Sequence, residues 1–186
     1  GLLGGHSGVD IHEQRGNAIR TLGRALDVVL GTTDARLASL HGGTAHNAIP
    51  RDAEAVVFLP AADVEAARGE LATLGEALRS ELANVDPGVQ LQLEPVSDAP
   101  GAWCAESTRR AVDLLLAAPH GVDAFSTDIE GLVETSNNLA TLRFYDGHDI
   151  FLTRQRSSVT GRLDLLTHRI ESVGRDAGAE VECDGG

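Results

Sequence analysis

The order of apolar patterns along the first half of the chain constrains its fold most. Two long stretches place apolar residues at spacings of three and four, which predicts two amphipathic helices. Asp10 or Glu13 can cap the first helix and Gly31 can end it, and the second helix covers residues 62–83. Short apolar or alternating runs predict strands at residues 2–9, 35–40, 55–59 and 89–93. This order, strand–helix–strand–strand–helix–strand, is that of the split βαβ unit, an antiparallel sheet with both helices on one face.

The second half of the chain continues the same class of structure. Pro100 and Gly101 interrupt the patterns, so one domain, 1–186, has two possible halves, 1–97 and 98–186. Apolar stripes predict helices near residues 106–117 and 159–173, and strands are expected at residues 131–134, 139–144, 149–154 and 179–183. Asp146-Gly147 is typical of a hairpin turn. We therefore expect an α+β fold in which helices cover one face of an antiparallel sheet of about seven or eight strands, a ferredoxin-like core with an extended second half.

The charge of the chain limits its partners. The net charge is −13 over 186 residues, which argues against nucleic acid and against an anionic membrane as partners. No apolar run approaches the ~18 residues of a membrane-spanning helix, and no charged-then-apolar signal segment opens the chain. The sequence contains no methionine and begins inside a patterned segment, so we expect it to be excised from a longer polypeptide.

The cysteines and histidines do not form a recognisable metal motif. Cys104 and Cys183 are isolated, which favours two buried thiols in a reducing cytosol over a disulfide or metal ligation. Among the seven histidines, close pairs are six or five residues apart, not the four that place two ligands on one helix face. We therefore expect no metal in this chain. Gly4-Gly5-His6-Ser7-Gly8 lacks the lysine of a phosphate-binding loop, and no nucleophile elbow is present.

A set of polar residues without an obvious structural task remains. It comprises Gly5-His6-Ser7-Gly8, Asn17-Ala18, Gly42-Gly43 with Asn47-Ala48-Ile49-Pro50-Arg51, Val133-Glu134-Thr135-Ser136 and Arg156-Ser157. Taken singly, each has an ordinary explanation as a turn former or an exposed side chain. In this order and at this spacing, the set resembles the lid domain of the aminoacyl-histidine dipeptidases (Xaa-His dipeptidase, peptidase D), which are relatives of carboxypeptidase G among the zinc exopeptidases. The resemblance covers essentially the whole chain.

The resemblance implies roles for three residues. His6 would be catalytic and donate a hydrogen bond to the scissile carbonyl oxygen, while Asn47 and Arg156 would bind the C-terminal carboxylate of a dipeptide such as a carnosine-type substrate. Arg154 competes with Arg156 for this role, and the serine that follows Arg156 favours Arg156. The metal-binding motifs of the family, a His-x-Asp segment and a Glu-Glu pair, are not found here. The two zinc ions are therefore expected in a separate catalytic domain of a cytoplasmic, homodimeric parent enzyme, and the isolated chain is expected to be inactive.

Two other interpretations stay open from the sequence. The chain could be a non-enzymatic dimerisation or small-ligand-binding module of ferredoxin-like type, which would bind or dimerise without a metal-containing partner domain. It could also be an unrelated structural domain.

Overall fold

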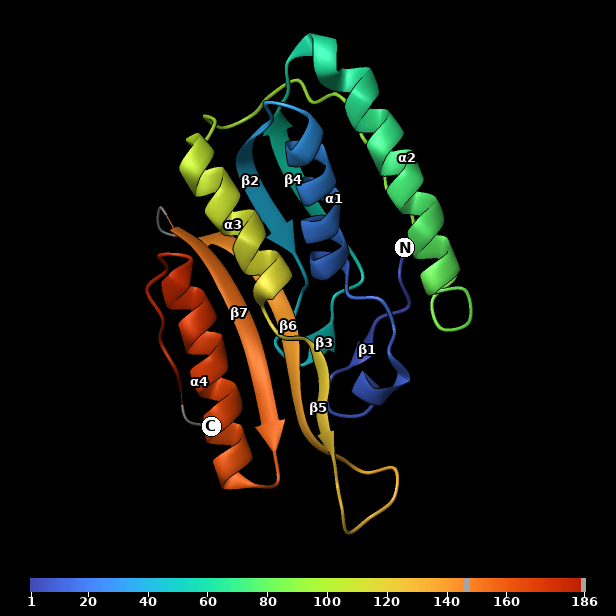
Figure 1. Cartoon of the computed structure of the whole chain (residues 1–186), viewed down its shortest axis with the longest axis vertical. Helices are drawn as coiled ribbons and strands as arrows, with labels where there is room; N and C mark the ends of the chain where they lie inside the picture. The colour runs from blue at the N-terminus through green and yellow to red at the C-terminus, as the bar shows by residue number, and fades with distance from the viewer. Residues whose placement is uncertain (146–147, 185–186) are drawn as a thin grey trace.

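The computed structural model describes residues 1–145 and 148–184, which form four helices, seven strands and two short 3₁₀ segments (Figure 1). In chain order the elements are β1 (Gly5–His6), η1 (Ile11–Glu13), α1 (Ala18–Thr32), β2 (Arg36–Gly42), β3 (Ala48–Ile49), β4 (Ala53–Phe58), η2 (Ala61–Asp63), α2 (Val64–Glu81), α3 (Ala105–Ala117), β5 (Gly121–Phe125), β6 (Val133–Tyr145), β7 (His148–Ser157) and α4 (Thr160–Asp176). None of the described helices is both long and apolar enough to cross a membrane.

The strands form a five-stranded and a two-stranded antiparallel sheet. The larger sheet has the order β4-β2-β6-β5, and β7 also pairs with β6. The β6–β7 ladder runs from Thr135 opposite Ser157 to Tyr145 opposite His148. Asp146-Gly147, where the hairpin turn was expected, lies outside the described residues. The smaller sheet pairs β1 with β3, and together the two sheets confirm the expected α+β class with antiparallel strands.

Helices cover one face of the larger sheet. In Figure 1, α1, α3 and α4 lie in front of the strands, and α2 lies beside α1. The main apolar core is formed where α1 and α3 meet the central strands, and its buried members are Ile19, Leu26, Leu37, Leu40, Val112, Leu115, Ala118, Leu139 and Leu142. The predicted stripes of the first and third helices thus supply the core.

The two halves of the chain share the order helix, antiparallel strand pair, helix, apart from β5 in the second half and the short β1 and β3 in the first. The first half contributes α1, the antiparallel pair β2 and β4, and α2, while the second contributes α3, the antiparallel pair β6 and β7, and α4. The halves meet where α1 packs against α3 and where β2 pairs with β6, at Gly42 opposite Leu142. A positive φ of 68° at Gly43 then turns the chain away, and a Cβ there would lie 2.0 Å from the carbonyl oxygen of Ala140. Only glycine permits this close approach of two backbones.

Three expectations about strands are wrong. Residues 89–93 form no strand: Val89 is buried and Leu91 and Leu93 pack on the helices, but no strand among the described residues lies beside them to form a ladder. Residues 179–183 also form no strand. The strands expected at 131–134 and 139–144 are one continuous strand, β6, because its polar middle is buried and paired on both sides.

The start of the first helix and the cysteines also differ from expectation. Neither Asp10 nor Glu13 caps α1. Asn17 does, because its Oδ1 accepts hydrogen bonds from the amides of Ile19 and Arg20 at 2.9 and 3.2 Å. Cys104 and Cys183 are unpaired, as expected, but both are exposed rather than buried, since they lie at the start of α3 and beyond the end of α4.

Candidate functional site

The β1–β3 ladder places His6 beside Asn47. His6 is the register partner of Ala48, and Gly5 is the partner of Ile49. The amide of the next residue, Ser7, donates a hydrogen bond to the carbonyl oxygen of Asn47 at 2.8 Å. These backbone contacts bring together two segments that lie about forty residues apart in the sequence. They do not depend on the side chains of His6 and Asn47.

The ring of His6 is oriented by its own loop. The amide of Gly8 donates to Nδ1 of His6 at 3.2 Å, and the backbone amide of His6 donates to Oδ2 of Asp10 at 2.7 Å. Because Nδ1 is an acceptor here, a neutral His6 carries its proton on Nε2. The exposed ring therefore offers one N–H donor to a group outside this domain.

The second half of the chain brings Arg156 to the same place. A Cβ built on Gly8 would lie 2.0 Å from Nη1 of Arg156 and 3.1 Å from Cε1 of His6, so both side chains lie against Gly8. Arg156 is half-buried, and its guanidinium makes no hydrogen bond or ion pair with any residue that the structure describes. In a chain of net charge −13, it is a guanidinium left available for an anion from elsewhere.

The geometry separates Arg156 from its competitor Arg154. The two lie on the same face of β7, because they are two residues apart in one strand. Arg154 is exposed and lies opposite Asn138, whereas Arg156 lies opposite Ser136 and reaches Gly8 and His6. Of the two arginines, only Arg156 is shown in contact with the glycine-rich loop that holds His6.

The absence of a side chain at Gly8 leads to a prediction. In Gly8→Ala the new methyl group must displace the guanidinium of Arg156, which is the end of a flexible side chain, so folding should change little. If Arg156 has the carboxylate-binding role that the resemblance implies, KM for a dipeptide should rise by roughly 10- to 100-fold in the longer parent enzyme, because the guanidinium is then misplaced. Thermal unfolding and steady-state kinetics test this. Gly69→Ala is the matched control, because no atom lies within 4 Å of a Cβ built at Gly69. A KM for Gly8→Ala equal to that of Gly69→Ala would contradict the prediction.

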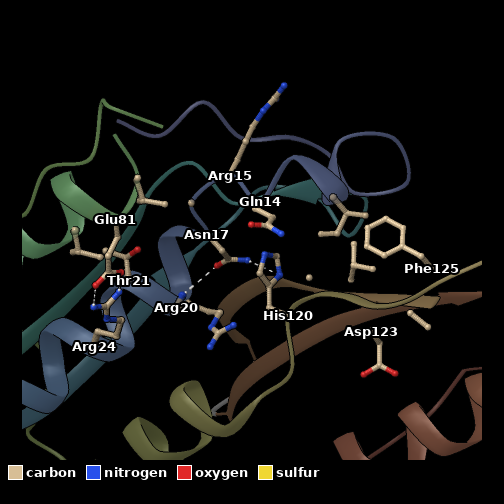
Figure 2. Close-up of a pocket in the computed structure, with 17 residues that line it drawn as sticks. Gln14, Arg15, Asn17, Arg20, Thr21, Arg24, Glu81, His120, Asp123 and Phe125 are labelled. Carbon is tan, nitrogen blue, oxygen red and sulfur yellow. Dashed lines mark hydrogen bonds and ion pairs between the residues drawn. The ribbon is translucent and has the colours of Figure 1, made fainter. Parts of the chain in front are cut away.

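Asn17 belongs to a different, structural cluster. The strand β6 pairs with β2 at Leu142 and with β5 up to Asn137, so Leu139 has no neighbouring strand on that edge. Nδ2 of Asn17 donates to the carbonyl oxygen of Leu139 at 2.8 Å, and the amide of Leu139 donates to Nδ1 of His120 at 3.3 Å. Figure 2 shows Asn17 and His120 side by side at this point, with their side-chain nitrogens 3.2 Å apart. These two side chains complete the backbone hydrogen bonding of a buried residue.

The pKa of His120 gives a second prediction. Burial, with a smaller effect from the charge of Arg20, lowers the pKa of His120 to about 4 from 6.5. The unfolded chain therefore binds a proton more readily than the folded one, and the free energy of unfolding should fall as pH drops from about 6.5 towards 4, by at most about 3 kcal/mol.

Urea unfolding at pH 7 and pH 5 tests this loss of stability. His120→Asn, which cannot titrate, should lose that part of the pH dependence, whereas His168→Asn on the exposed side of α4 should keep it. If the free energy of unfolding changed equally between pH 7 and pH 5 in both variants, His120 would not be the group responsible for the pH dependence.

One groove in the surface lies away from His6, Asn47 and Arg156. It measures about 570 Å³ between the start of α1 and β5, and its lining includes Arg20, His120 and Phe125 (Figure 2). None of the three candidate residues lines it.

Within residues 1–145 and 148–184, no three histidine, cysteine or carboxylate side chains gather in a way that could hold a metal ion. The candidate site is an open surface that carries the guanidinium of Arg156 and the exposed imidazole of His6.

Comparison with known proteins relates the chain to a domain of peptidases. Residues 1–86 match the peptidase dimerisation domain family, and over its whole length the chain is homologous to part of known dipeptidases. It is 36% identical over 185 residues to the cytosol non-specific dipeptidase of Escherichia coli (strain K12), and it covers 38% of that protein. The crystal structure of the aminoacylhistidine dipeptidase from Vibrio alginolyticus superimposes with a TM-score of 0.91 at 34% identity, over 98% of this chain and 37% of that one. The chain thus spans less than two fifths of the length of these relatives.

Proposed function

We propose that this chain is the lid and dimerisation domain of a cytoplasmic, homodimeric metallo-dipeptidase that hydrolyses Xaa-His dipeptides. The observation that carries the proposal is the convergence of His6, Asn47 and the unpaired Arg156 on one open surface. The homology to dipeptidases more than twice as long supports a separate catalytic domain. The dipeptide binds between this surface and that domain.

Arg156 and Asn47 recognise the end of the substrate. A dipeptidase must distinguish a free C-terminal carboxylate from a continuing chain. A planar guanidinium can donate two parallel hydrogen bonds to a carboxylate. The side-chain amide of Asn47, half-buried and without a hydrogen-bond partner among the described residues, adds a further donor. These groups explain why an acidic domain binds an anionic substrate end.

His6 acts on the scissile bond. As negative charge develops on the carbonyl oxygen, the N–H at Nε2 donates a hydrogen bond to it. The hydrogen bond from Gly8 to Nδ1 keeps the donor on the correct nitrogen. Two zinc ions, implied by the family resemblance, would supply the activated water, and their ligands are expected in the catalytic domain. Closure of the lid brings His6 to the substrate and excludes water from the site.

The proposal is tested with paired substrates. The full-length protein, supplied with zinc, is assayed on an Xaa-His dipeptide and on the same dipeptide with a C-terminal amide. Hydrolysis of the first with a kcat/KM at least roughly 10-fold above that of the second is expected, because one charge-assisted contact is lost. Absence of hydrolysis for both, or equal rates, would overturn the assignment. Sedimentation of the same protein at the mass of a single chain would overturn the homodimer.

A further inference from the structure

Asn138 lies in β6, the strand of the larger sheet that pairs with β2, β5 and β7. It is not one of the residues proposed to contact the substrate. Its side chain is 1% exposed. It lies opposite Arg154 in the β6–β7 ladder and therefore points to the face that carries Arg154 and Arg156. The neighbouring Asn137 lies opposite Gln155 and points to the other face, where its Nδ2 donates to the carbonyl oxygen of Pro119 at 2.6 Å.

The amide of Asn138 holds the segment that contains Asn47. Its Nδ2 donates to the carbonyl oxygen of Ala48 at 2.8 Å and approaches that of His46 at 3.5 Å. These are the residues on either side of Asn47. The carbonyl oxygen of Asn47 itself is held from the opposite direction by the amide of Ser7.

These contacts connect the two halves of the site. On one side of the segment, β3 pairs with β1, which carries His6. On the other side, Asn138 belongs to β6, whose partner strand β7 carries Arg156. The start of the same loop is fixed separately, because Nη2 of Arg143 donates to the carbonyl oxygen of Thr44 at 2.7 Å. Asn138 therefore sets the position of residues 46–48 relative to Arg156, while the loop start is held without it.

We infer that Asn138 is a positioning residue for substrate binding: by holding the carbonyl groups beside Asn47, it fixes the distance between Asn47 and Arg156, so that both reach the two oxygens of one carboxylate. This inference rests on the proposed function. It assigns to Asn138 no contact with the substrate.

The test compares Asn138→Leu with Asn137→Leu in the full-length enzyme. The two asparagines are matched: they are adjacent, almost fully buried, donate to a backbone carbonyl and leave Oδ1 without a partner among the described residues. Both variants should lose stability. Only Asn138→Leu should raise KM for the dipeptide, by roughly 10-fold, with a smaller change in kcat. Asn138→Ala is measured in the same way if the leucine variant does not fold.

A double-mutant cycle separates this inference from the proposed function. If Asn138 acts through Asn47, its effect on KM should largely disappear in an Asn47→Ala background. Provided that Asn47→Ala alone raises KM, two results would overturn the inference. One is a folded Asn138 variant with a KM within about 3-fold of wild type. The other is an Asn138→Leu variant whose KM changes as much as that of Asn137→Leu. If Asn47→Ala leaves KM unchanged, the proposed site itself is wrong.

Discussion

Replacing His6 by alanine in the full-length enzyme is expected to lower kcat by roughly 100- to 1,000-fold, the usual loss when one donor to a developing oxyanion is removed. KM should change little, because in its proposed role His6 would donate to the carbonyl oxygen mainly as charge develops on it. The fold should persist, since the ring is exposed and the β1–β3 ladder uses only its backbone.

The control for this variant lies six residues further on. His12 is also exposed and belongs to the short η1 segment of the same loop, but no contact of its ring with the site residues is found. His12→Ala should therefore keep wild-type kinetics. His6→Gln, which retains an N–H donor on a flexible side chain, should recover part of the lost turnover. An unchanged kcat in His6→Ala would remove His6 from the reaction.

Arg156→Ala is expected to act on binding instead. The loss of hydrogen bonds to a charged group should weaken capture of the dipeptide by roughly 1.5–3 kcal/mol, which corresponds to a rise in KM of about 10- to 150-fold. Arg156→Lys should restore only part of this affinity, because an ammonium group cannot donate the two parallel hydrogen bonds of a guanidinium.

The substrate itself provides a check on the role of Arg156. With a C-terminally amidated dipeptide, wild type and Arg156→Ala should differ much less than with the free acid, because the partner of the guanidinium is then missing. Arg154→Ala, which removes an exposed arginine from the same face of β7, should raise KM far less than Arg156→Ala. If Arg154→Ala has the larger effect, the carboxylate-binding role passes to Arg154.

The sequence predicted the four helices well, because each depends on a pattern within a short segment. The stripes along α1 and α3 predicted which residues form the core. The preference for Arg156 over Arg154 came from a neighbouring serine, whereas the structure adds the contact between Arg156 and Gly8. The roles of His6, Asn47 and Arg156 in substrate binding remain predictions.

The features that the sequence did not predict depend on contacts between distant segments. The alternation at residues 89–93 is that of a strand, and its apolar side is packed as a strand would be, but a ladder also needs a neighbour, which no local pattern reveals. The strand β5 begins at Gly121, within Pro119-His120-Gly121, a sequence that only signals the end of a helix. Asn17 lies more than 100 positions before both His120 and Leu139 in the sequence, so no spacing rule could find their junction.

The division of the domain into two covalently connected halves determines how its surface should respond when the protein is diluted. His6 and Asn47 belong to the half that contains α1, and Arg156 belongs to the half that contains α4, so the surface is complete only when the halves are docked. A covalent connection between two docking units gives them an effective concentration on the order of millimolar. The surface that carries His6, Asn47 and Arg156 should therefore stay assembled at any protein concentration. A fall in specific activity on dilution would then report on contacts made outside this domain.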